Sequence, residues 1–274
     1  PDARLQLMQE SAITILCLPD EAARDAVALA DGDASIRFID ASTAHRVDQN
    51  WVYGFPELTT AQRGMIATAP RISNPGCYPT GFLALVRPLI ESGVLPADCR
   101  LNVPAVSGYS GGGKSMIGAH DAGGLAPQFS YGVNLAHKHL AEMTHYAGLQ
   151  TPPIFMPSVG DFYAGMLVHL PLHADQFSTA VNADQLYQLY ADWYAGAALV
   201  RMGAACANDD NTSNMLAADA LADTDSMEIL VFSDVQARRF WLVARLDNLG
   251  KGASGAAVQN MNIALGIDEA ISLA

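Results

Sequence analysis

The chain has 274 residues, half of them hydrophobic, and a formal net charge of −13 at pH 7. This length is enough for two globular domains with substantial cores. The acidic balance argues against nucleic acid or an anionic membrane as a partner, because both bind basic surfaces. No apolar run approaches the length of a membrane span and no signal peptide is recognisable, so we expect a cytoplasmic protein that acts on small molecules.

The first quarter of the chain alternates between strand and helix patterns. Residues 11–19 predict a buried strand, 20–32 a helix with an acidic first turn, and 34–42 a second strand. Parallel sheets built from such units bind ligands beyond the carboxyl ends of their strands. We therefore expect Leu18–Asp20 and Asp40–Arg46 to lie at a cofactor edge, and Cys17, inside the apolar run, to be a packed core residue.

One cysteine has unusual surroundings. Cys77 follows the turn sequence Asn-Pro-Gly and precedes a segment, 78–93, whose apolar residues are spaced for one helical face. We expect Cys77 at a helix N-terminus, where unpaired N–H groups and the helix dipole favour the nucleophilic thiolate. A cysteine that merely lies near a turn is the alternative. Cys99 and Cys206 carry no motif, and the cysteine spacings suggest neither a zinc knuckle nor a redox pair.

A nucleophilic cysteine needs a base or a cationic partner, and imidazole is the usual one. The sequence supplies His137 and His139, with Glu142 three residues further on. The same three residues could suggest metal ligands, but no further ligand cluster supports a metal site, and we expect none.

Residues 107–115, SGYSGGGKS, match the pattern of the phosphate-binding loop of nucleotide hydrolases through Gly108, Gly113, Lys114 and Ser115. That loop requires a helix directly after it, whereas residues 116–128 are interrupted by glycines and end near a proline, which predicts a poor helix. We therefore expect a phosphate site without nucleotide hydrolysis, with a flexible glycine loop as the alternative.

The later chain has a different pattern. Residues 165–173, 226–234 and 238–247 predict strands, and 182–199 a long amphipathic helix with Asn182 or Asp184 as its cap. These elements indicate an α+β second domain with an antiparallel sheet.

A dinucleotide fold opens with a strand and a glycine-rich turn, and nothing before residue 12 offers one. Either the cofactor is not a dinucleotide or the opening strand and turn are missing from this chain.

Six motifs, in order, carry a resemblance to a known family. They are DASTAHR (40–46), WVYGFPEL (51–58), SNPGCYPTG (73–81), SGYSGGGKS (107–115), HKHLAEM (137–143) and LDNLGKGASGAAVQNMN (246–262). The chain resembles, from about Ala12 to its end, the shorter type of N-acetyl-gamma-glutamyl-phosphate reductase of the semialdehyde dehydrogenase group.

The resemblance implies a fold and a reaction. The fold is a Rossmann-type dinucleotide domain (1–76 and 248–274, opening strand and turn missing) plus an α+β, glyceraldehyde-3-phosphate-dehydrogenase-like catalytic domain (77–247) with an antiparallel sheet. The reaction is NADPH-dependent reduction of an acyl phosphate, N-acetyl-glutamyl 5-phosphate, to the 5-semialdehyde through a cysteine thioester in arginine biosynthesis. A homodimer or homotetramer is implied. A cysteine hydrolase or acyltransferase without dinucleotide, or an inactive fragment, is the alternative.

The resemblance and the motifs together give the expected site residues. Catalysis is assigned to Cys77 with His139 or His137. Substrate and phosphate binding are assigned to Asn74, Ser107, Ser110, Gly111, Lys114 and Glu142. NADP(H) binding is assigned to Leu18, Pro19, Ser42, Arg46, Gly113, Asn248, Gly250 and Lys251.

Overall fold

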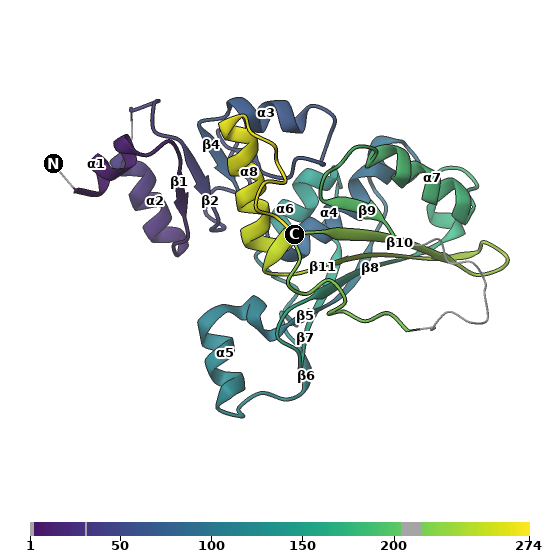
Figure 1. The fold of residues 1–274 in the computed structure, drawn as a ribbon. Helices are drawn as coiled ribbons and strands as arrows, with labels where there is room; N and C mark the ends of the chain where they lie inside the picture. Colours follow the sequence, from purple (N-terminus) through teal and green to yellow (C-terminus); the bar gives the residue numbers. More distant parts are fainter. Residues whose placement is uncertain (1–2, 31, 204–214) are drawn as a thin grey trace. The chain divides into compact units, whose positions relative to one another are not determined.

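The computed structural model describes residues 3–30, 32–203 and 215–274, so Cys206 lies outside the described residues. The chain forms two compact units, one of residues 1–76 with 253–273 and one of residues 77–252 with 274 (Figure 1). Residues 248–252, expected in the dinucleotide domain, lie in the second unit.

The first unit contains a four-stranded parallel sheet in the order β1-β2-β4-β3. Its elements are α1 (Ala3–Glu10), β1 (Thr14–Leu16), α2 (Asp20–Leu29), β2 (Phe38–Asp40), β3 (Val52–Tyr53), α3 (Gln62–Thr68), β4 (Arg71–Ser73) and α8 (Gly255–Leu265). The predicted strand–helix–strand unit is confirmed, with shorter strands. Leu16, Asp40 and Ser73 are in register, so β1, β2 and β4 end at one edge.

Helices cover both faces of this sheet. Leu16 and Phe38 pack with alanines of α2 on one face, while Ile39 and Ile72 pack with α3 and α8 on the other. The prediction that Cys17 is a core residue is wrong, because Cys17 is exposed. β1 is an edge strand whose side chains alternate between faces, and Cys17 continues the side of Ile15, which is also exposed.

The second unit contains a seven-stranded sheet in the order β6-β7-β5-β8-β11-β10-β9. Its strands are β5 (Asn102–Gly108), β6 (Gln128–Ser130), β7 (Ile154–Gly160), β8 (Met166–His173), β9 (Val200–Met202), β10 (Met227–Ser233) and β11 (Arg239–Leu246). The sheet is mainly antiparallel, as predicted, but β5 pairs with β7 and β9 with β10 in parallel. Parallel pairs need long crossovers, and the 45 residues from Tyr109 to Pro153 join β5 to β7.

The helices α4 (Cys77–Glu91), α6 (Leu140–Ala147) and α7 (Ala183–Trp193) belong to the second unit, and α4 and α7 pack directly on the sheet. α4 is buried along most of its length, and Gly81 lets it approach β8, since a Cβ there would lie 2.8 Å from Val168 Cγ2. The predicted cap of α7 is confirmed at Asn182, whose side chain accepts from the Gln185 N–H at 2.9 Å.

The opposite face of the seven-stranded sheet, here called the open face, carries exposed apolar side chains. Ile154, Met156 and Trp241 are each 42–50% exposed there. The segment that contains Leu216 and Ala218 packs on its centre, against Leu230 and Val243. Within the described residues no helix is long and apolar enough to cross a membrane.

Candidate functional site

Cys77 is the first residue of α4, which confirms the prediction that it lies at a helix N-terminus. The residue is half-buried. A side chain at position 252 would press on it, because an ideal Cβ on Gly252 would lie 2.9 Å from Cys77 Cβ. The helix N-terminus favours the thiolate, and the backbone of residue 252 fixes where the thiol-bearing carbon lies.

Two tyrosines that the sequence analysis did not single out surround Cys77. The Tyr78 hydroxyl donates to the Ser158 carbonyl at 3.0 Å and interacts with the Tyr131 and Ser107 hydroxyls. Burial, and then the charges of Tyr131 and Cys77, raise the pKa of Tyr78 far above its ordinary value. Burial also raises the pKa of Tyr131 to about 12, with the negative charge of Cys77 acting in the same direction. Both phenols therefore stay neutral beside a thiolate.

The predicted histidines and Glu142 lie together. The ring centroids of His137 and His139 are 4.7 Å apart, and His139 Nε2 lies 4.0 Å from the Glu142 carboxylate. His139 and Glu142 are both buried, whereas His137 is half-buried. Tyr78 directly follows Cys77 in the chain, and its ring centroid is 6.2 Å from that of His139, so Tyr78 connects Cys77 to the histidines.

A third group lies at the end of β5. Asn248 Nδ2 donates to Ser110 Oγ and Asn248 Oδ1 accepts from the Gly165 N–H, each at 2.9 Å. A Cβ on Gly111 would lie 3.0 Å from Ser107 Oγ. The structure therefore brings together four predicted residues, Ser107, Ser110, Gly111 and Asn248, although the last was assigned to the cofactor rather than to the substrate.

The prediction of a poor helix after the glycine loop is wrong, because α5 (Gly113–Asp121) begins directly after the 3-10 turn η1 (Tyr109–Gly112). Gly118 is accommodated inside this helix, and only Gly123 and Gly124 follow its end. The loop still differs from a nucleotide-binding loop, whose backbone N–H groups cradle phosphates. Here the N–H groups of Gly108, Tyr109 and Ser110 donate to carbonyls of residues 162–165.

Gly113 and Lys114 start α5 and are exposed. No residue of α5 is buried. The helix is attached through His120, whose ring stacks on Tyr109 at 3.7 Å between centroids and whose Nε2 contacts the Asp161 carboxylate at 2.8 Å. No sequence pattern indicates this contact, since its partners are 41 residues apart.

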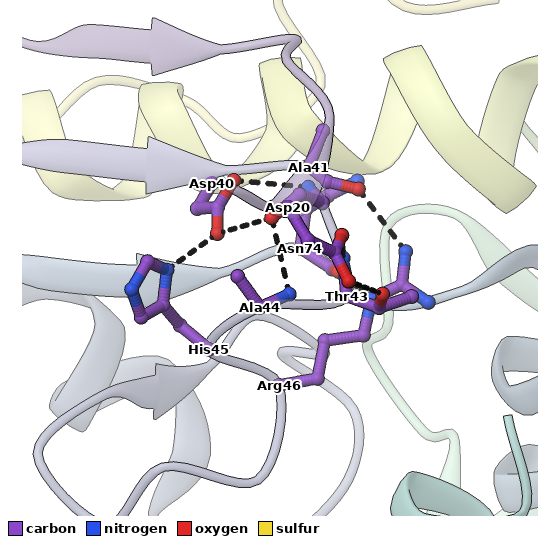
Figure 2. A network of polar contacts seen from close by, with 9 residues as sticks. Asp20, Asp40, Ala41, Thr43, Ala44, His45, Arg46 and Asn74 are labelled. Atoms are coloured by element: carbon purple, nitrogen blue, oxygen red, sulfur yellow. Dashed lines mark hydrogen bonds and ion pairs between the residues drawn. The ribbon is translucent and has the colours of Figure 1, made fainter. Parts of the chain in front are cut away.

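The polar edge of the first unit follows the carboxyl ends of β1, β2 and β4 (Figure 2). The fully buried Asp40 accepts from Ser42 Oγ at 2.8 Å and contacts His45 Nδ1 at 2.7 Å. Asp20 accepts from the N–H and hydroxyl of Thr43. These contacts hold the predicted cofactor loop in one conformation.

Arg46 and Asn74 lie at the same edge. Arg46 is buried, and its Nε donates to the Asn74 carbonyl at 3.0 Å (Figure 2). The Asn74 side chain donates to the Ala253 carbonyl and accepts from Asn260 Nδ2. Two buried oxygens here, Ser73 Oγ and Asn260 Oδ1, have no hydrogen-bond partner within the described part of the chain. No sequence motif distinguishes either residue. Leu18 and Pro19 are exposed beyond β1.

The remaining predicted cofactor residues lie in the segment after β11. Gly250 and Lys251 begin a short π-helix over residues Gly250–Ser254, and Lys251 is fully buried. Gly250 is required because a Cβ would collide with the Thr224 carbonyl. π-helical turns are rare and frequent at functional sites. Among the described residues no group of three or more His, Cys, Asp or Glu side chains could hold a metal ion.

Comparison with known proteins gives consistent relatives. Residues 77–248 match the family model described as semialdehyde dehydrogenase, dimerisation domain. N-acetyl-gamma-glutamyl-phosphate reductase from Trichormus variabilis is 46% identical over 99% of this chain and 87% of its own length. The same-named protein from Brucella anthropi is 46% identical over 97% of this chain and 86% of its own.

Solved structures share the fold at low identity. Aspartate semialdehyde dehydrogenase II from Vibrio cholerae superposes with a TM-score of 0.71 at 17% identity, over 94% of this chain and 81% of that one. The Candida albicans aspartate semialdehyde dehydrogenase with NADP gives 0.63 at 12% identity, over 93% and 77%.

Proposed function

The chain belongs to the N-acetyl-gamma-glutamyl-phosphate reductase family of oxidoreductases, and on that basis we propose that it reduces N-acetyl-glutamyl 5-phosphate to N-acetyl-glutamate 5-semialdehyde and phosphate with NADPH. This is a step of arginine biosynthesis and suits the cytoplasmic location expected from the sequence. The observation that carries the proposal is the placement of Cys77 at the N-terminus of α4, beside two neutral phenols and close to the histidine pair.

The first half of the reaction forms a thioester. The Cys77 thiolate attacks the carbonyl carbon of the acyl phosphate, a C–S bond forms, and the bond from carbon to the phosphate oxygen breaks. Ser107 and Ser110 lie together near Tyr78 and supply hydroxyls for the phosphate. Lys114, exposed at the start of α5, supplies a positive charge. His137 and His139 supply the proton and hydrogen-bond chemistry.

The carboxyl edge of the first unit suits a nicotinamide cofactor, because parallel sheets of this kind bind dinucleotides there. When bound, the reduced nicotinamide supplies the hydride that the thioester requires. Ser73 Oγ and Asn260 Oδ1, buried without partners in the described part of the chain, suit a ligand that brings hydrogen-bonding groups such as a carboxamide. Leu18, Pro19, Ser42 and Arg46 would hold the cofactor at the ends of β1 and β2 in the first unit. Asn248, Gly250 and Lys251, which belong to the second unit, remain predicted cofactor residues. The NADP of the Candida albicans relative supports the choice of cofactor.

The test combines turnover with the mass of the intact protein. Phosphate-dependent reduction of NADP by N-acetyl-glutamate semialdehyde is followed at the nicotinamide absorbance for the wild type, Cys77→Ser and Cys99→Ser. Separately, each protein is incubated with the acyl phosphate without cofactor, and its intact mass is measured by mass spectrometry. Cys99 is a matched control, since it is also half-buried and reduced.

We expect turnover and an acyl adduct in the wild type and Cys99→Ser, and neither in Cys77→Ser. Release of free acid and phosphate at full rate without cofactor would instead indicate a cysteine hydrolase. Turnover that survives Cys77→Ser would refute the thioester route.

We further propose that the open face of the seven-stranded sheet binds a second copy of this chain. The matching family model is described as a dimerisation domain and spans the whole of this sheet. Ile154, Met156 and Trp241 leave apolar area exposed on the face. Near Trp241 the surface has a hollow of about 420 Å³, lined by residues including Pro171 and Phe232. An apolar patch of this kind indicates an interaction surface.

A further inference from the structure

His137 has a hydrogen bond that fixes where its proton lies. Its Nδ1 accepts from the backbone N–H of His139 at 3.2 Å. A ring nitrogen that accepts a hydrogen bond carries no proton, so the neutral ring carries its proton on Nε2. Among the described residues Nε2 has no hydrogen-bond partner. The ring therefore offers one N–H donor and no acceptor.

The surroundings of the ring favour the neutral form. Burial, and then the positive charge of Lys138, lower the pKa of His137. The rings of Tyr131, His139 and Phe155 pack around it with centroids 4.7–5.6 Å away. Protonation at Nδ1 would also break the hydrogen bond from the His139 N–H. The His137 ring packs on Tyr131, whose pKa the charge of Cys77 raises, so His137 and Cys77 belong to the same cluster of side chains.

We propose that His137 donates a hydrogen bond from Nε2 to the carbonyl oxygen of the substrate and does not deprotonate Cys77. The inference rests on the proposed thioester reaction. When the thiolate attacks, the C–S bond forms and the carbonyl electron pair moves to oxygen, where the Nε2–H stabilises the negative charge. The pair returns as the bond to phosphate breaks, and the released phosphate takes its proton from water.

The same donor serves the second tetrahedral stage. Hydride adds to the thioester carbon, a C–H bond forms and the oxyanion forms again. Its electron pair then returns to rebuild the carbonyl, and the C–S bond breaks to release aldehyde and thiolate. The proton of His137 stays on Nε2 throughout. His139, buried beside the Glu142 carboxylate, is then the histidine left to exchange a proton with the Cys77 thiol.

Two substitutions of His137 distinguish a hydrogen-bond donor from a general base. His137→Gln keeps an N–H close to the position of Nε2, whereas the shorter side chain of His137→Asn does not reach it. Loss of one oxyanion donor costs about 100- to 1,000-fold in kcat. We expect a loss of that size in His137→Asn, and His137→Gln to stay within about ten-fold of the wild type. His145→Gln, an exposed histidine on α6, is the matched control and should be unchanged.

Two further measurements test the role of His137 without measuring turnover. The pH dependence of Cys77 alkylation by iodoacetamide should be the same in the wild type and in His137→Gln. The ¹⁵N spectrum of the full-length wild type, with His137 assigned by its loss in His137→Gln, should show a proton on Nε2 and none on Nδ1 at pH 7. A proton on Nδ1, or a raised pKa for alkylation in His137→Gln, would overturn the inference.

These outcomes are separable from failure of the proposed function. If no acyl adduct forms on Cys77, the thioester route fails, and with it the donor role, whatever the ring nitrogens show. If the adduct forms but His137 carries its proton on Nδ1, only the present inference is wrong.

Discussion

Replacing Gly252 by alanine tests whether the backbone behind Cys77 positions the nucleophile. The new Cβ would lie 2.9 Å from Cys77 Cβ and 2.9 Å from the Asp247 carbonyl oxygen, whereas ordinary contact begins at 3.4 Å. Neither neighbour is the far end of a flexible side chain, so Cys77 or the backbone must move by about 0.5 Å. Because a displacement of 1 Å costs about 100-fold in rate, we expect kcat/KM to fall about ten-fold.

Overpacking also costs stability, about 1–3 kcal/mol. The assay is therefore turnover together with thermal unfolding, and the rate of Cys77 alkylation reports the reactivity of the thiol directly. Gly64→Ala is the control, since its Cβ would meet nothing within 4 Å on α3 and should leave turnover unchanged. Wild-type turnover in Gly252→Ala, with the fold intact, would refute the claim that residue 252 sets the position of the nucleophile.

Three further predictions concern stability and assembly. Asn182→Ala removes the cap of α7 and should lower the free energy of unfolding by about 1 kcal/mol in urea titrations, whereas no change would show that the cap is replaced by water. The hydrogen bond to Asp161 raises the pKa of His120. The His120–Asp161 contact therefore stabilises the folded state in full below the unfolded pKa of His120, about 6.5, and this stabilisation is lost as pH rises through the higher folded pKa. The difference in melting temperature between the wild type and His120→Gln should thus be larger at pH 5.5 than at pH 9, and a constant difference would contradict this. Trp241→Arg should shift the sedimentation of the protein towards monomer, while Met65→Arg, equally exposed at 43%, should not; an unchanged dimer would exclude the open face.

The N-terminal position of Cys77 could be predicted because its determinants are local. Proline and glycine fix a turn just before it, and the apolar spacing after it fits one helical face. The cap of α7 was predictable for the same reason, since Asn182 and Gln185 satisfy each other within one turn. Cys17 shows where local pattern fails. An apolar run predicts burial, but only the position of β1 at the sheet edge decides that one side of the strand is exposed.

The partners of Cys77 were decided by tertiary structure. Tyr78 and Tyr131 have no distinguishing spacing, and they reach Cys77 because α4 packs on the sheet near the segment that follows β6. The attachment of α5 through His120 and Asp161 joins residues 41 positions apart. The sequence alone determined which residue types could do the chemistry and where helices begin, because turns, caps and periodicity act over a few residues. The structure decided which of them share a site, because packing brings together residues that are distant in the chain.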